Sequence, residues 1–127
     1  MEIKIAILDD DPVTLAILEK ALAAQERTIF KARNGLEGYG LISREKPDLV
    51  VTDLLLPHID GFELCRRIRN DPVLAGTKII LISAVYKGFY FRKDILESGA
   101  DAFAEKPLDI EFLKKTARRL LEESSLS

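Results

Sequence analysis

The sequence is short of the residues that build disulfides and structural metal sites. Its 127 residues include one cysteine, Cys65, one histidine, His58, and no tryptophan. A single cysteine excludes an internal disulfide and indicates a reducing compartment. A lone cysteine with a lone histidine cannot supply the four ligands of a structural zinc site. We therefore expect Cys65 to be a buried helix residue, His58 to be a solvated loop residue, and neither to be a functional site.

Long apolar runs and an excess of positive charge are also missing. No segment approaches the ~20 apolar residues of a membrane span, and the chain starts with a strand-like run instead of a signal peptide. The 19 Lys and Arg residues stand against 21 Asp and Glu residues, a net charge of −2, whereas nucleic-acid-binding domains usually show a basic excess. We expect a cytoplasmic protein that binds neither a membrane nor nucleic acid directly.

What the sequence does contain is five short apolar runs that alternate with helical patterns. The apolar runs predict strands at 3–8, 28–32, 48–53, 78–82 and 101–104. The helical patterns follow predicted caps at Asp11, Asp60 and Asp109 and cover 36–44 and 87–98. Strands that alternate with helices predict an α/β fold with a parallel sheet covered on both faces. We expect one domain over residues 1–123, with a frayed tail at 124–127.

Polar residues follow four of the predicted strands at the point where each strand ends. They are Asp9 with Asp10, Asp53, Ser83 and Lys106. Right-handed crossovers place ligands beyond the carboxyl ends of parallel strands. We therefore expect carboxylates, a hydroxyl and an ammonium group to meet at one edge of the sheet.

These groups suit phosphoryl transfer. Converging carboxylates need a compensating cation to stay ionised, and Mg²⁺ favours oxygen ligands. One aspartate alone would be read as a helix cap or a solvated loop residue, but Asp9, Asp10 and Asp11 in succession favour a metal site. An aspartate carboxylate can also attack phosphorus, while a metal and a lysine neutralise the developing charge.

The same residues carry a resemblance to a known family. The chain resembles the receiver domain of two-component response regulators over residues 3–122. Its matching segments are Ile7-Leu8-Asp9-Asp10-Asp11-Pro12, Asp53-Leu54-Leu55-Leu56-Pro57 with Asp60-Gly61, Ile82-Ser83-Ala84, and Gly99-Ala100-Asp101 with Glu105-Lys106-Pro107. The resemblance implies a doubly wound, flavodoxin-like (CheY-like) fold with sheet order 2-1-3-4-5 and five helices.

The resemblance also implies roles for single residues and for partners. It implies that a histidine kinase or histidine phosphotransfer protein phosphorylates Asp53. It implies that Mg²⁺ is held by Asp9, Asp10, Asp53 and the Leu55 backbone carbonyl, and that Ser83, Lys106 and Phe103 respond to the phosphoryl group. The implied protein is a signalling switch and not an enzyme with its own substrate. Its output surface is the fourth helix, fifth strand and fifth helix, which controls an output domain or partner; a homodimer is left open.

Two departures from the family pattern lead to hypotheses. Phe103 stands where tyrosine is commoner, so the switch would work by packing, or Phe103 is an ordinary core residue. Leu55 and Val85 are apolar where side chains flank the line of attack of hydrolytic water. We hypothesise that the phosphorylated state is slow to hydrolyse. An aromatic cluster near the fourth helix is read either as packing or as a partner surface; its members are Tyr86, Phe89, Tyr90 and Phe91.

Two other functions remain open at this stage. The pattern Asp9-x-Asp11-x-Val13 also fits the opening motif of haloacid-dehalogenase-type phosphatases, but that class needs a later acidic pair and leaves Asp53 unexplained. A receiver-like interaction module that works without phosphorylation is the second alternative. The intact set of strand-end residues argues against this second alternative.

Overall fold

All five predicted strands and all five predicted helices are found. The computed structural model describes residues 2–84 and 88–126, with side chains for 2–84 and 93–124. Within these residues the strands are β1 (Ile3–Leu8), β2 (Arg27–Ala32), β3 (Leu49–Asp53), β4 (Lys78–Ser83) and β5 (Ala102–Glu105). The helices are α1 (Pro12–Leu22), α2 (Gly35–Glu45), α3 (Gly61–Asn70), α4 (Gly88–Glu97) and α5 (Ile110–Leu126). Each strand end agrees with the predicted one or differs from it by one residue.

The sheet has the order β2-β1-β3-β4-β5, and each neighbouring pair is parallel. This confirms the predicted doubly wound α/β fold. Every residue of the central strand β3 is buried, which explains its unbroken apolar run. At the edge, β2 is mostly half-buried. The strand that carries Asp53 is thus the most enclosed element of the sheet.

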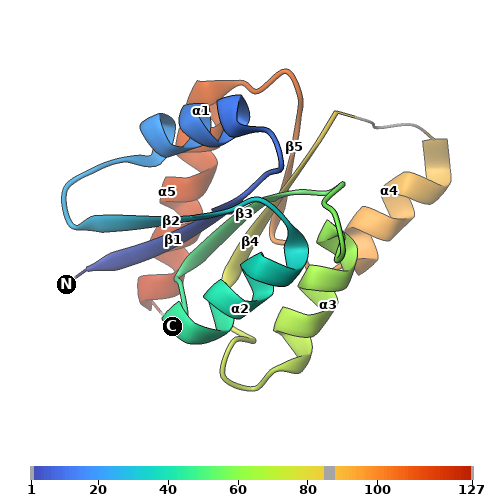
Figure 1. The fold of residues 1–127 in the computed structure, drawn as a ribbon, viewed down its shortest axis with the longest axis horizontal. Helices are drawn as coiled ribbons and strands as arrows, with labels where there is room; N and C mark the ends of the chain where they lie inside the picture. The colour runs from blue at the N-terminus through green and yellow to red at the C-terminus, as the bar shows by residue number, and fades with distance from the viewer. Residues whose placement is uncertain (1, 85–87, 127) are drawn as a thin grey trace.

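Helices cover both faces of the sheet, and each face has its own core (Figure 1). On one face, α1 and α5 pack onto the strands through apolar stripes at helical spacing, whose fully or nearly buried members are Leu15, Leu18, Leu22, Leu113, Ala117 and Leu120. On the other face, α2 and α3 supply Leu41, Ile42, Leu64, Cys65 and Ile68. Cys65 is completely buried, as predicted, and His58 is exposed.

Capping side chains begin the helices where the sequence predicted them. Asp11 Oδ1 accepts from the Val13 amide at 3.0 Å, Asp60 Oδ1 accepts from the Glu63 amide at 2.9 Å, and Asp109 Oδ1 accepts from the Phe112 amide at 3.0 Å. Each carboxylate satisfies an amide that the first turn of a helix leaves unpaired.

Helix α2 packs closely against the sheet at Gly38. A Cβ atom at Gly38 would lie 2.1 Å from Leu8 Cδ2, so a larger residue would push α2 away from β1. Glycine in a helix interior ordinarily weakens the helix. The structure shows that the missing side chain allows the helix to pack directly against the strand that leads to Asp9.

The last helix, α5, continues to Leu126. The domain limits at 1–123 and the frayed tail at 124–127 stay predictions. No helix in the described part of the chain has both the length and the apolar character needed to cross a membrane.

Candidate functional site

The strand register explains why distant residues meet at one edge of the sheet. Leu8 lies opposite Thr52 in the β1–β3 pair, so Asp9 and Asp53 follow at the same level. Ser83 lies opposite Glu105 in the β4–β5 pair, so Lys106 follows at the level just beyond Ser83. The predicted convergence of strand ends is therefore a consequence of parallel pairing.

Three of the predicted residues form an acidic cluster. Carboxylate oxygens of Asp9, Asp10 and Asp53 all lie within 4.8 Å of one another. Asp9 is 1% exposed and Asp53 is 8% exposed, whereas Asp10 is open to solvent. The cluster thus has a buried floor with one carboxylate at its mouth.

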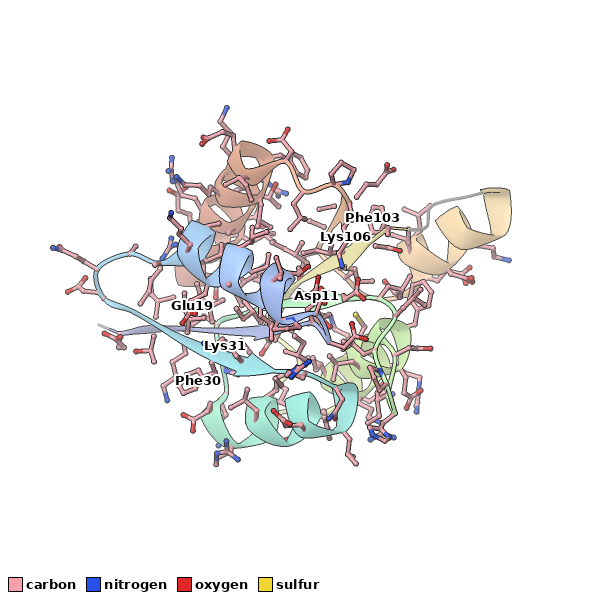
Figure 2. The ribbon with its side chains drawn as sticks, turned by 45° about the horizontal axis from the view of Figure 1, so that its top comes forward. Asp11, Glu19, Phe30, Lys31, Phe103 and Lys106 are labelled. Atoms are coloured by element: carbon pink, nitrogen blue, oxygen red, sulfur yellow. The ribbon has the colours of Figure 1, made fainter. Side chains whose placement is uncertain are left out.

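Lys106 reaches into this cluster from the end of β5. Its Nζ atom lies 3.1 Å from Asp9 Oδ2 and 3.4 Å from Asp53 Oδ1. In Figure 2, Lys106 and Asp11 are seen close to the same edge of the sheet, one after β5 and the other at the start of α1. The ammonium group therefore bridges the carboxylates that follow two different strands.

Burial and charge shift the titration of the groups in the cluster. Burial raises the pKa of Asp53, the ammonium of Lys106 opposes that rise, and the Asp9 charge adds to it. Burial works against the charged form of Lys106, but the hydrogen bond to Asp9 and the charges of Asp53 and Asp9 outweigh it and raise the Lys106 pKa. The cluster has more carboxylates than ammonium groups, and a bound cation would relieve the repulsion between the carboxylates.

The three consecutive aspartates divide into two kinds. Asp9 Oδ1 accepts from the Asp11 amide at 2.9 Å, while its second oxygen faces Lys106. The Asp11 carboxylate caps α1 and also accepts from Thr14 Oγ1 at 3.0 Å. These bonds, that from the Val13 amide first, lower the pKa of Asp11. Asp9 and Asp10 therefore belong to the cluster, and Asp11 belongs to the helix.

The donor set fits a hard divalent cation. The cluster offers carboxylate oxygens only, with one exposed member through which water ligands can be kept, and Mg²⁺ prefers such a site. The loop after Asp53 is shaped by two bonds of Leu54, whose amide donates to the Ile82 carbonyl and whose carbonyl accepts from the Gly61 amide, each at 2.7 Å. The ligand role of the Leu55 carbonyl stays a prediction.

Ser83 and Phe103 lie on neighbouring strands. Ser83 is 1% exposed at the end of β4. Phe103 lies opposite Leu81 and is half-buried against the core of the α2 and α3 face; Figure 2 shows it near Lys106 on β5. Their switching role stays a prediction. The predicted aromatic cluster and Val85 lie outside the side chains that the structure describes.

One residue at this edge was not singled out from the sequence. Arg33 Nη2 donates to the Asp10 backbone carbonyl at 3.0 Å. In the sequence, Arg33 is a charged residue between an apolar run and Asn34-Gly35. The signal that could have found it is the β1–β2 pairing, because Leu8 lies opposite Ala32 and places residue 33 beside the acidic pair.

Comparison with known proteins gives one consistent result. The family model described as "Response regulator receiver domain" matches residues 5–118. The response regulator PleD of Caulobacter vibrioides is 32% identical over 120 residues, which cover 94% of this chain and 26% of that protein. The regulator RpaA of Synechocystis, described as a DNA-binding dual master transcriptional regulator, is 32% identical over 124 residues, 93% of this chain and 48% of that protein.

A solved structure agrees in both sequence and fold. The signal receiver domain of a signal transduction histidine kinase from Syntrophus aciditrophicus has a TM-score of 0.87 and 32% identity, and the match covers 94% of this chain and 90% of that chain. The chain thus spans nearly all of a solved receiver domain but only about a quarter to a half of the two curated relatives named above.

Proposed function

This chain belongs to the response regulator receiver domain family of two-component signalling, and from that premise we propose that Asp53 is its phosphoacceptor. The observation that carries the proposal is the cluster of Asp9, Asp10 and Asp53 with Lys106 bridging its floor. A nucleophile, an oxygen ligand set and a cationic side chain stand together at the end of the most buried strand. Phosphoryl transfer to a carboxylate needs these three elements.

The proposed reaction is an in-line transfer from a phosphohistidine. A carboxylate oxygen of Asp53 attacks phosphorus, the new O–P bond forms as the P–N bond breaks, and the imidazole of the donor leaves with the electron pair. A divalent cation held by the cluster would neutralise charge on the phosphoryl oxygens. Lys106 is placed to pair with a phosphoryl oxygen, because its Nζ atom already lies 3.4 Å from Asp53 Oδ1.

The proposed switch begins from the charge that this reaction adds. The phosphoryl group brings acceptor oxygens to a site already rich in negative charge, and the Ser83 hydroxyl is to donate to one of them. Phe103 would repack when Ser83 moves, and the surface of α4, β5 and α5 would change its preferred state. The partners are a histidine kinase or phosphotransfer protein and an output domain or downstream protein, in the cytoplasm.

The test is phosphorylation of the purified chain with acetyl phosphate and Mg²⁺. Intact-mass spectrometry is expected to show one added phosphoryl group on the wild type and none on Asp53→Asn, since an amide is a poor nucleophile. Loss of labelling when Mg²⁺ is chelated would support the metal role. Equal labelling of Asp53→Asn would move the acceptor elsewhere and favour an interaction module that works without phosphorylation of this site.

The lifetime of the acyl phosphate is part of the proposal. The Leu55 side chain is 61% exposed beside the site and offers no hydrogen bond to an attacking water. We expect the phosphorylated protein to persist for minutes, and Leu55→Asn to shorten its half-life. Decay of the wild type within seconds in the presence of Mg²⁺ would contradict this part and leave the acceptor assignment intact.

The phosphatase alternative does not agree with the geometry. A haloacid-dehalogenase-type mechanism would use Asp9 and Asp11 together, but the Asp11 carboxylate is bonded to the first turn of α1. Asp53, not Asp11, completes the cluster with Asp9 and Asp10. Sustained turnover of a chromogenic phosphate ester is therefore not expected.

A further inference from the structure

Arg33 is held beside the acidic cluster by hydrogen bonds of the residues on both of its sides. Before it, the Ala32 carbonyl accepts from the Asp9 amide at 3.1 Å. After it, Asn34 Oδ1 caps α2 through the Glu37 amide at 2.8 Å. The position of the Arg33 backbone is thus set by the β1–β2 pairing and by the start of a helix.

The Arg33 side chain completes a chain of hydrogen bonds into the buried floor of the cluster. Its guanidinium donates to the Asp10 carbonyl at 3.0 Å. The amide of the same peptide group, that of Asp11, donates to Asp9 Oδ1 at 2.9 Å. Asp9 Oδ2 then accepts from Lys106 at 3.1 Å. Both ends of the peptide between Asp10 and Asp11 are therefore held, one by Arg33 and one by Asp9.

We propose that Arg33 is a positioning residue for the cation site. By orienting the peptide that follows Asp10, it holds the exposed carboxylate of Asp10 and the buried carboxylate of Asp9 in the arrangement that binds the cation. This inference rests on the proposed function only in assuming that the cluster takes Mg²⁺. Groups that orient metal ligands contribute to affinity without touching the metal.

The charge of Arg33 acts in the opposite direction, which makes the inference testable. A guanidinium near the cluster repels a divalent cation, and salt screens this repulsion. If charge were the whole effect, removing Arg33 would tighten cation binding. If positioning dominates, removing Arg33 weakens binding, and added salt does not restore it.

Lys31 offers a matched control. It lies two residues earlier, on β2, and is exposed, and its Nζ atom pairs with Glu19 Oε1 at 3.0 Å. Figure 2 shows Lys31 and Glu19 next to each other and separated from Asp11 and Lys106. Lys31→Ala removes one positive charge from β2 without touching the Asp10 carbonyl.

The experiment is calorimetric titration of the whole chain with MgCl₂, repeated with MnCl₂. We expect Arg33→Ala to weaken binding by about 10-fold, the low end of the scale for groups that orient metal ligands. We expect Arg33→Lys to recover part of the loss and Lys31→Ala to bind at least as tightly as the wild type. Circular dichroism melts without cation check that the variants are folded, because an exposed arginine whose contact is a surface hydrogen bond should not decide the fold.

The outcomes separate the two proposals. Arg33→Ala that binds as tightly as the wild type, or more tightly, overturns the positioning role while acetyl phosphate labelling of Asp53 stands. Equal tightening by Arg33→Ala and Lys31→Ala would show that charge alone acts and would also overturn it. A wild type that neither binds Mg²⁺ nor accepts a phosphoryl group overturns both proposals.

Discussion

Charged side chains lie at both ends of the sheet. Negative charge is in excess at one end, and the charges are matched at the other. At the carboxyl ends of the strands, three carboxylates lie together, and the ammonium of Lys106 pairs with two of them, Asp9 and Asp53. At the amino ends of β4 and β5, Arg69 pairs one to one with Asp101 at 2.8 Å. The same guanidinium also donates to the backbone carbonyls of Gly99, Ala75 and Thr77, at 2.9, 2.9 and 2.6 Å.

The difference indicates which end is built for a ligand. Asp101 Oδ2 also accepts from the Ile79 amide at 2.8 Å, so the Arg69 cluster is matched in charge and bonded to the chain around it. Such a cluster holds loops together. The Asp53 cluster is left with excess negative charge and one open carboxylate, and that imbalance is typical of functional sites.

The largest expected effect comes from removing the ammonium group of Lys106 at the carboxyl ends of the strands. Lys106→Met should slow phosphorylation by acetyl phosphate by about 10²-fold, the scale on which loss of one charge-stabilising donor lowers a rate. Arg69→Met also removes one positive charge, but at the other end of the sheet, and should leave the initial labelling rate of the folded protein unchanged. Equal labelling rates for Lys106→Met and the wild type would contradict the proposed role of Lys106 in phosphoryl transfer.

Removing the guanidinium of Arg69 at the amino ends of β4 and β5 should instead lower the stability of the fold. Arg69→Met removes four hydrogen bonds and leaves Asp101 without its charged partner. We expect a loss of about 2–4 kcal/mol in the free energy of unfolding. Urea titration followed by circular dichroism measures it. Arg69→Lys should lose less, because one charge remains. A loss below that of Lys31→Ala would show that the Arg69 cluster is not structural.

Neutralising the acceptor should stabilise the protein when no divalent cation is present. Asp53→Asn removes a buried charge that Lys106 compensates only in part, and a gain of about 1–2 kcal/mol is expected at neutral pH. Mg²⁺ should then stabilise the wild type and have less effect on the variant. Urea titrations with and without Mg²⁺ measure both effects.

The same comparison has a defined pH dependence. Burial raises the pKa of folded Asp53 above its ordinary value of 3.8, so the unfolded chain releases this proton first as the pH rises. Stability contributed by the protonated residue is present below 3.8 and is lost as the pH rises through the folded pKa. The gain in stability from Asp53→Asn should therefore be absent below pH 3.8 and should grow as the pH rises through the folded pKa of Asp53. A gain that is constant with pH would contradict a raised pKa for this residue.

The smallest effect concerns Cys65, which lies near the Arg69 cluster. Burial raises the pKa of its thiol to about 12, the charge of Arg69 opposes that rise, and the charge of Asp101 adds to it. Ellman's reagent should react with the native thiol only through opening of the structure. Arg69→Met should speed this reaction, whereas Lys106→Met should change it little. Rapid labelling of the native wild type would mean that the α3 face opens without unfolding.

Most of the fold and the centre of the site could be predicted because both follow from the order of residues along the chain. Apolar runs and caps at Asp11, Asp60 and Asp109 are local signals. Asp9 and Asp53 could be predicted because each ends an apolar strand, and parallel pairing brings such ends together. The switching roles of Ser83 and Phe103 rest on the family resemblance and stay predictions.

The residues that were missed depend on contacts between segments distant in sequence. Arg33 and Arg69 both look like solvated arginines on polar stretches. Arg33 acquires its contact only when β2 pairs with β1, and Arg69 acquires its contacts only when the loops before β4 and β5 close around it. The role of Gly38 depends on such a contact too, since only the packed structure places Leu8 against it.

The sequence by itself determined the alternation of strands and helices, the two-sided burial of β3 and the chemical types available at the strand ends, because hydrophobic periodicity and chain order are local properties. The tertiary structure decided which charges are matched. In the folded chain, Asp11 caps α1 and Asp9 pairs with Lys106. Arg33 donates to the backbone carbonyl of Asp10. Distances between side chains depend on register and packing, and electrostatic interactions depend on those distances.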